Sequence, residues 1–245
     1  MVCSVDSVAR CVIQGIKQLN DEYGCSWCLH PGQKVEKGNG TVRVYDAKVY
    51  EKRTSKNVVA HTRKALSLCS FCDVLHASSL LLLNQFDIAR GFAVDYMHCI
   101  LLGVSRSLAG LWFDLEHHNE SYYLGQHISV VDDRLMALRR PSCISRAPRS
   151  LKLRSYWKAS EWRNWLHFYS VMCIHGLMDT LYIKHYLLFV CAIDILNGVS
   201  IDMQDLNLAR NMLVLFVSEF PSMYGLNNMS YNVHQLLHVA DTVET

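Results

Sequence analysis

Helical periodicity in the second half of the chain is the feature that most constrains the fold. From residue 160 onward, apolar residues recur at the spacing of amphipathic helices, and Gly, Asn and Pro interrupt the pattern. The segments expected to be helical are 160–179, 180–197, 202–220 and 230–243, with earlier ones at 7–20, 94–115 and 128–138. Residues 2–5 and 42–45 are expected to be short strands. The sequence therefore predicts a mainly α protein with minor α/β character.

Composition narrows the class of protein. The 245 residues are 51% hydrophobic and 19% charged, which excludes a disordered chain and allows one large domain or two small ones. The formal charge is only +2, so any surface for nucleic acid must be local. No Walker-type loop, GxGxxG or GxSxG motif is present. We expect no signal peptide and no membrane partner, because the most apolar run, 186–193, is far shorter than the roughly 20 residues of a membrane span.

Cysteine spacing is the strongest indication of a metal site. The chain has ten cysteines, and without a secretion signal reduced thiols or metal ligands are expected rather than disulfides. Cys25 and Cys28 form a CxxC motif in a compact turn, a spacing that lets two thiolates bind one Zn²⁺. Cys69 and Cys72 repeat this spacing. We predict zinc at Cys25 and Cys28; candidates for the remaining ligands are His61, Cys69 and Cys72, with His30 competing. The alternative is that both pairs are small buried hydrophobes.

Two histidines on the last predicted helix offer a further pair of ligands. His234 and His238 lie four residues apart, and an HxxxH pair can chelate zinc, although no acid of the HExxH type stands between them. We weigh packing or capping above chelation for this pair.

Three residues in the first hundred could serve catalysis. Asp6 ends the first predicted strand, where a carboxylate can hold a divalent cation or cap the next helix. Asp95 and His98 lie three apart on one helical face, so they could share a metal or orient one another. The alternative for this pair is a buried hydrogen bond that ties the helix to the core.

A local basic segment spans residues 134–163. It holds nine Lys and Arg residues and one acid, Glu161, and Trp157, Trp162 and Trp165 lie in or beside it. Basic and aromatic residues interleaved in this way suit phosphate contacts and base stacking, with strong salt dependence. The residues we expect to contact nucleic acid are Arg146, Arg149, Lys152, Arg154, Lys158 and Arg163. The alternative is a solvated loop with the tryptophans in the core, which the spacing of Trp162 and Trp165 favours for those two.

Several blocks, in order along nearly the whole chain, resemble transposase-domain proteins of the CACTA type. They include Val2-Cys3-Ser4-Val5-Asp6-Ser7-Val8-Ala9-Arg10, Tyr23-Gly24-Cys25-Ser26-Trp27-Cys28-Leu29-His30-Pro31-Gly32, Val94-Asp95-Tyr96-Met97-His98, Ile144-Ser145-Arg146-Ala147-Pro148-Arg149-Ser150, Tyr156-Trp157-Lys158-Ala159-Ser160-Glu161-Trp162-Arg163 and Asn232-Val233-His234 with His238. The resemblance implies a DDE-type enzyme with a ribonuclease-H-like core, in which two aspartates and a glutamate hold two Mg²⁺ or Mn²⁺ ions for DNA cleavage and strand transfer.

By this resemblance, Asp6 looks like the second catalytic aspartate, and Asp95 and His98 look like the DxxH motif of the group. Whether Asp6 or Asp95 is the metal ligand stays open. The blocks for the first aspartate and the glutamate are missing, so we expect a fragment that is inactive alone, with Cys69 and Cys72 departing from the family pattern. The resemblance also implies a nuclear protein that binds double-stranded DNA and forms homo-oligomers.

The expected domain organisation follows from these features. Residues 1–24 would be a partial ribonuclease-H-like core segment, residues 25–75 a CxxC knuckle with loops, and residues 76–245 a helical, insertion-like domain that carries the basic segment. The expected function is that of a transposase-derived, DNA-binding protein with an incomplete catalytic set. The alternatives are a zinc-stabilised, non-catalytic module for nucleic-acid or protein interaction, and a helical remnant with no selected function.

Overall fold

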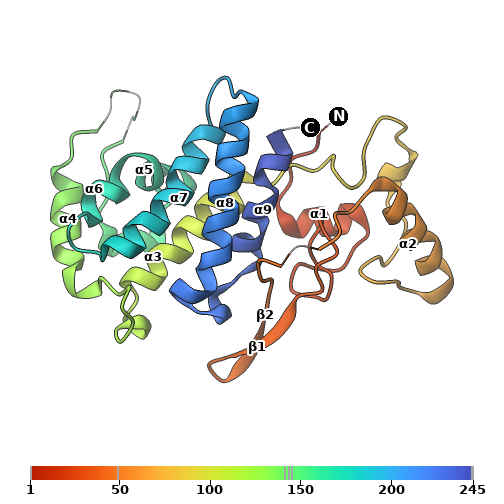
Figure 1. The fold of residues 1–245 in the computed structure, drawn as a ribbon, viewed down its shortest axis with the longest axis horizontal. Coiled ribbons are helices and arrows are strands. Elements are labelled where there is room, and N and C mark those ends of the chain that lie inside the picture. Colours follow the sequence, from red (N-terminus) through yellow and green to blue (C-terminus); the bar gives the residue numbers. More distant parts are fainter. Residues whose placement is uncertain (1, 49, 141, 143, 145, 244–245) are drawn as a thin grey trace. The chain divides into compact units, whose positions relative to one another are not determined.

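Helices make up most of the structure, a computed structural model that describes residues 2–48, 50–140, 142, 144 and 146–243 (Figure 1). The α-helices are α1 (Ser7–Gln14), α2 (Ser55–Leu68), α3 (Arg106–Phe113), α4 (Ile128–Ala137), α5 (Ala159–Asn164), α6 (Ser170–Ile174), α7 (Thr180–Leu196), α8 (Met203–Tyr224) and α9 (Tyr231–Val243), and the strands are β1 (Gln33–Lys37) and β2 (Gly40–Val44). One π-helical segment, Tyr96–Ser105, leads into α3, and another, Trp165–Tyr169, joins α5 to α6. The predicted mainly α class is confirmed. No helix in the described ranges has the length and apolar character that crossing a membrane requires.

The chain divides into two units, and the division differs from the expected boundaries after residues 24 and 75. One unit comprises Met1–His98 and Val217–Thr245, and the other comprises Cys99–Phe216. The end of the chain thus belongs with its beginning, a long-range grouping that local sequence patterns do not encode. The division falls inside α8.

The unit 99–216 is built around aromatic side chains. Trp112, Trp162 and Trp165 are fully buried, and Trp157 packs against Trp162 with ring centroids 5.0 Å apart. Phe189 of α7 stacks on Phe216 of α8. The alternative interpretation of the tryptophans as core residues is therefore the correct one, because burial of such large apolar rings dominates the packing energy. The predicted helix 160–179 is realised as α5, the π-helical segment and α6.

The unit formed by 1–98 and 217–245 has little sheet. β1 and β2 form an antiparallel hairpin with Gln33 opposite Val44 and Lys37 opposite Gly40. The predicted first strand is reduced to one parallel bridge between Cys3 and Phe92. Within the expected ribonuclease-H-like segment 1–24, the described residues form this bridge, α1 and an isolated antiparallel bridge between Ile16 and Val74, and these do not establish that fold.

Local capping explains how the helices of this unit begin and end. Asp6 caps α1 by accepting hydrogen bonds from the backbone N–H groups of Val8 and Ala9. Gly15 ends α1 at a φ of 71°, a conformation that favours glycine, and a Cβ there would lie 2.4 Å from the His76 carbonyl oxygen. α9 contacts this part of the unit through Tyr231, whose hydroxyl accepts a hydrogen bond from buried Arg10.

Candidate metal centre

Four buried side chains converge in the unit formed by 1–98 and 217–245. Cys25, Cys28, His234 and His238 each offer one ligand atom, and these atoms all lie within 4.8 Å of one another. The Cys25 Sγ is 3.6 Å from the His238 Nε2, and the Cys28 Sγ is 3.4 Å from the His234 Nε2. Two thiols and two imidazoles in a closed, buried cluster are the ligand set of a structural zinc site.

The distances fit a tetrahedral ion. With Zn–S bonds of about 2.3 Å and Zn–N bonds of about 2.05 Å, the edge between a sulfur and a nitrogen of a regular tetrahedron is about 3.6 Å. The two sulfur–nitrogen distances of 3.6 and 3.4 Å lie close to this value. The donor chemistry also fits, since thiolate and imidazole together select Zn²⁺ over the hard cations Mg²⁺ and Ca²⁺.

Two separate pieces of backbone place the four ligands. Cys25 and Cys28 lie in the turn before β1, and an isolated antiparallel bridge between Cys28 and Lys52 holds this turn in place. His234 and His238 lie one turn apart on α9, so their imidazoles project from the same face of the helix. The CxxC turn and α9 are more than 200 residues apart in the sequence, and the site is where they meet.

Hydrogen bonds to sulfur surround the first thiol. The backbone N–H of Trp27 lies 3.4 Å from the Cys25 Sγ, and the Gln235 side-chain amide donates to the same sulfur at 3.3 Å. Arg10 in turn reaches the Gln235 Oε1 at 3.5 Å. Such donors orient a ligating thiolate and stabilise its negative charge.

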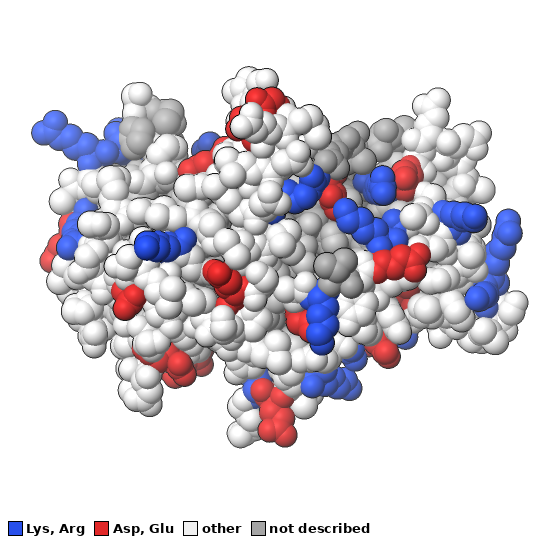
Figure 2. Space-filling view, in the orientation of Figure 1, with Lys and Arg blue, Asp and Glu red and all other residues white. Residues whose placement is uncertain are grey.

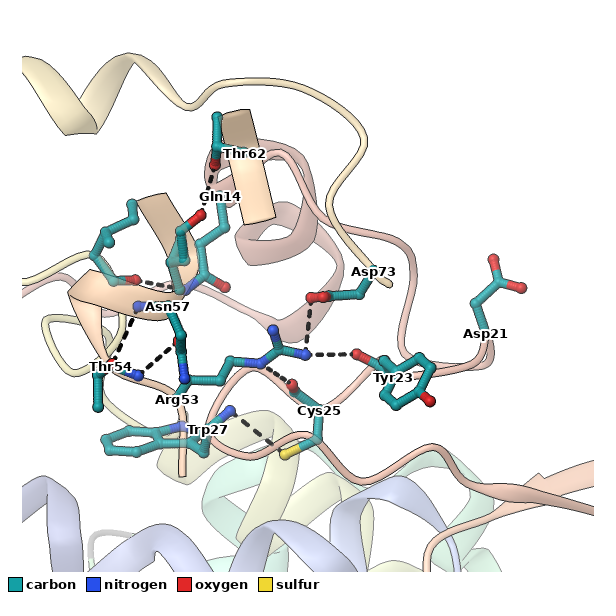
Figure 3. A network of polar contacts seen from close by, with 12 residues as sticks. Gln14, Asp21, Tyr23, Cys25, Trp27, Arg53, Thr54, Asn57, Thr62 and Asp73 are labelled. Carbon is teal, nitrogen blue, oxygen red and sulfur yellow. Dashed lines mark hydrogen bonds and ion pairs between the residues drawn. The ribbon is translucent and has the colours of Figure 1, made fainter. Parts of the chain in front are cut away.

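A buried arginine, Arg53, anchors the backbone of the CxxC turn (Figure 3). The Arg53 guanidinium donates to the carbonyl oxygens of Cys25 at 2.8 Å and Tyr23 at 2.9 Å, and it forms an ion pair with Asp73 at 2.8 Å. The Asp73 side chain is fully buried, and the positive charge of Arg53 compensates its negative charge in this buried position. Arg53 therefore ties the turn to the segment after α2.

The electrostatics of the cluster favour one negative sulfur. Burial raises the pKa of Cys25, but the hydrogen bond from Cys28 and the charges of His234 and His238 outweigh it, so that this pKa lies well below 9.0. The same hydrogen bond, together with burial, raises the pKa of Cys28. Burial lowers the pKa of His238, but the charge of Cys25 and contact with Asp241 outweigh burial and raise it. A cation bound between the ligands would favour the thiolate form of both cysteines.

The acid next to His238 extends the network to the surface. Asp241 Oδ2 lies 3.9 Å from the His238 Nδ1 and 2.8 Å from the Lys52 Nζ. Burial raises the pKa of Asp241, but contacts with His238 and Lys52 outweigh it and lower this pKa to about 2. A carboxylate on the outer side of a ligating histidine is a common second partner at zinc sites.

The structure brings some of the predicted zinc ligands together and leaves others outside the cluster. Cys25 and Cys28 come together as predicted, but the other members of the cluster are His234 and His238, for which we expect packing or capping. His61, Cys69 and Cys72 are not members of the cluster that the described residues form. Cys69 is an exposed residue at the end of α2, and the His61 ring packs against Phe71. The HxxxH spacing was the signal that could have identified the right partners.

The predicted catalytic acids take structural roles. Asp6 caps α1, and Asp95 accepts a hydrogen bond from the backbone N–H of His98 while its Oδ2 lies 2.6 Å from the His98 Nδ1. This imidazole is exposed, so the expected buried tie to the core is not what the pair provides. Asp6 follows Cys3 by three residues, and Asp95 follows Phe92, the partner of Cys3 in the parallel bridge, by the same number. The described residues do not assemble a third potential ligand around either acid for Mg²⁺ or Mn²⁺.

The predicted nucleic-acid contacts divide into paired and unpaired cations. Arg149 pairs with Glu161, with its second terminal nitrogen 2.8 Å from the Oε2, and Arg154 pairs with Asp114. The other members of the set are exposed and form no ion pair among the described residues: Arg146, Lys152, Lys158 and Arg163. Pro141, Cys143 and Ser145, which belong to the same stretch, lie outside the described residues. On the face drawn in Figure 2, basic side chains stand singly or in small groups among acidic ones.

Comparison with protein-family models, with curated proteins and with solved structures finds no match for this chain.

Proposed function

We propose that this chain is a transposase-derived, DNA-contacting module whose first and last segments are held together by a structural zinc ion. The observation that carries the proposal is the cluster of Cys25, Cys28, His234 and His238. DNA is proposed as the partner because the sequence blocks resemble CACTA-type transposases. The unpaired cations of the basic segment are the proposed surface that contacts it.

A structural role for the ion follows from the ligand set. Four protein ligands complete a tetrahedron and leave no position for water or substrate, whereas catalytic zinc keeps one position open. All four ligands are buried, and His234 is only 1% exposed. Zinc here would cross-link the CxxC turn to α9 rather than activate a water molecule.

DNA contact would rest on charge rather than on base reading. Arg146, Lys158 and Arg163 are exposed and form no ion pair among the described residues. Each cation that neutralises a phosphate releases counterions. Three such contacts would therefore steepen the slope of log K against log salt by at most about 2.7. The tryptophans that accompany these cations are buried, so stacking on bases is not part of the proposal.

DNA cleavage by this chain is not part of the proposal. Asp6 and Asp95 each accept backbone hydrogen bonds at the start of a helix, and a two-metal site needs several acids around one pair of ions. We expect no nicking of DNA with Mg²⁺ or Mn²⁺. Metal-dependent nicking that Asp6→Asn abolishes would contradict this expectation.

The DNA surface is tested by a charge-neutralising triple substitution. Arg146→Gln, Lys158→Gln and Arg163→Gln together should weaken binding to duplex DNA of any sequence and flatten its salt dependence. A matched control is Lys34→Gln, Lys56→Gln and Arg63→Gln, which removes three exposed cations from the other unit. Fluorescence anisotropy of a labelled duplex over a range of salt concentrations measures both effects. Equal affinity of the triple variant and the wild-type protein would remove this DNA surface.

A further inference from the structure

A pocket of about 320 Å³ lies in the unit 99–216, between α3, the 3₁₀ helix Leu151–Tyr156 and α5. Its lining includes Arg106, Asp114, Lys152, Arg154 and Trp162. Ligand pockets in proteins span roughly 300–1,000 Å³, so this one has room for a small group. It is separate from the metal centre, which belongs to the other unit.

The charges in the pocket favour an anion. Three basic side chains face one carboxylate, and Asp114 is already paired with Arg154. Arg106 and Lys152 are exposed and form no ion pair in the described part of the chain. Two uncompensated cations beside a concave surface attract a negatively charged ligand.

The shape of α3 opens the pocket. Arg106 and Gly110 lie one helical turn apart on the same face, and the missing side chain at Gly110 leaves space beside the arginine. A Cβ at Gly110 would come within 3.1 Å of the Asp114 Oδ2 and meet no other atom within 4 Å. The hollow beside Gly110 is therefore open rather than filled by a neighbouring side chain.

A buried donor without an acceptor is the second observation that indicates a ligand. Trp162 lines the pocket and is 1% exposed, and its indole Nε1 has no hydrogen-bond partner among the described residues. Buried N–H groups almost always find an acceptor, in the protein or in a bound molecule. An anion that enters the pocket brings acceptor oxygens to its lining.

We infer that this pocket binds a phosphate group, either a phosphodiester of the DNA backbone or a free phosphate. Arginine presents several N–H donors in a plane that matches phosphate oxygens, and lysine adds a point charge. The DNA source rests on the proposed function, whereas the free-phosphate source does not. Lys152 and Arg154 belong to the basic segment, and Arg106, from α3, joins them only in the folded chain.

Inorganic phosphate tests the pocket directly. Wild-type protein should broaden the ³¹P resonance of inorganic phosphate, and Arg106→Gln or Lys152→Gln should relieve the broadening, because each removes a cation from the lining. Lys184→Gln, which removes an exposed cation of α7 in the same unit, is the matched control and should broaden the resonance as the wild-type protein does. Arg106→Lys keeps the charge and should retain part of the effect.

Duplex DNA identifies the source of the phosphate. If a backbone phosphodiester occupies the pocket, Arg106→Gln should lower DNA affinity about three- to tenfold and reduce the salt slope by about one unit. If DNA affinity is unchanged while ³¹P broadening is relieved, free phosphate is the ligand, and the inference still stands.

The inference and the proposed function can fail separately. No broadening by the wild-type protein, or broadening that Arg106→Gln and Lys152→Gln leave intact, overturns the phosphate pocket. The triple substitution of Arg146, Lys158 and Arg163 lies outside this pocket, so its effect on DNA binding reports on the proposed function alone. If the triple variant loses DNA binding while the pocket substitutions have no effect in either assay, the proposed function is supported and the phosphate pocket is refuted.

Discussion

Removal of zinc should destabilise the unit formed by 1–98 and 217–245 far more than the unit 99–216. The ion would join Cys28 to His234, which lie 206 residues apart, so that it acts as a cross-link over most of the chain. In the chain-entropy model, a cross-link that closes a loop of this length stabilises the folded state by about 5 kcal/mol. For chains of this size each kcal/mol shifts Tm by about 2–4 °C, so the expected shift is about 10–20 °C.

The metal-free site is not expected to collapse completely. The two sulfur–nitrogen contacts of 3.6 and 3.4 Å remain possible as hydrogen bonds, each worth about 1 kcal/mol. The expected result is therefore a separate low-temperature transition after treatment with EDTA, rather than loss of all structure.

Calorimetry with and without EDTA measures the shift, and elemental analysis gives the zinc content. Cys28→Ala should lose zinc and melt like the EDTA-treated wild-type protein. Cys11→Ala is the matched control, because Cys11 is equally buried in the same unit but lies outside the cluster. This control should lose about 1 kcal/mol through packing and keep both its zinc and its response to EDTA. Cobalt substitution should give the visible spectrum of a tetrahedral ion with thiolate ligands.

Two results would refute the reasoning. The first is a zinc content below about one tenth of an ion per chain, which is incompatible with the affinity of a closed structural site. The second is an equal EDTA response in wild-type protein and Cys28→Ala, which would place the chelated metal elsewhere.

Four further predictions concern single side chains. Arg53→Met should lower the free energy of unfolding in urea by about 3–5 kcal/mol, because it leaves the buried charge of Asp73 unpaired. The double variant Arg53→Met, Asp73→Leu should recover much of this loss. If the effects of the two substitutions are fully additive, the two side chains are not coupled. Asp6→Ala should cost about 0.5–2 kcal/mol through the lost helix cap, while Asp6→Asn should cost only a few tenths in the same assay. Glu161→Gln should raise DNA affinity about two- to threefold in anisotropy titrations, since it frees the arginine that this acid neutralises; a decrease would argue against phosphate contact there. Burial raises the pKa of Asp87, but a serine hydroxyl and two backbone N–H groups outweigh burial and lower this pKa below 3.8. The ionised Asp87 therefore stabilises the folded state above pH 3.8, and this stabilisation is lost as the pH falls through the lower pKa of the folded state. Unfolding experiments between about pH 5 and 2 should therefore show a weaker pH dependence in Asp87→Asn than in the wild-type protein.

Local features of the fold were readable from the sequence. The apolar periodicity predicts α7 and α9 to within a residue or two, because side chains on one face of a helix recur every three to four positions regardless of what they pack against. The predicted end at residue 220 fails for α8, which continues past Pro221 to Tyr224. The CxxC spacing likewise predicts a pair of ligands, since two thiols in one tight turn are close in any fold.

Convergence of distant segments was decided by the tertiary structure alone. Nothing within the CxxC turn specifies that its partners are His234 and His238 rather than Cys69 and Cys72, which share its spacing. In the same way, Arg106 reaches the pocket beside Lys152 only because α3 packs near the 3₁₀ helix. Periodicity and motif spacing report on a few turns of backbone, whereas ligand sets and pockets depend on the path of the chain between them, which the burial of its apolar faces determines.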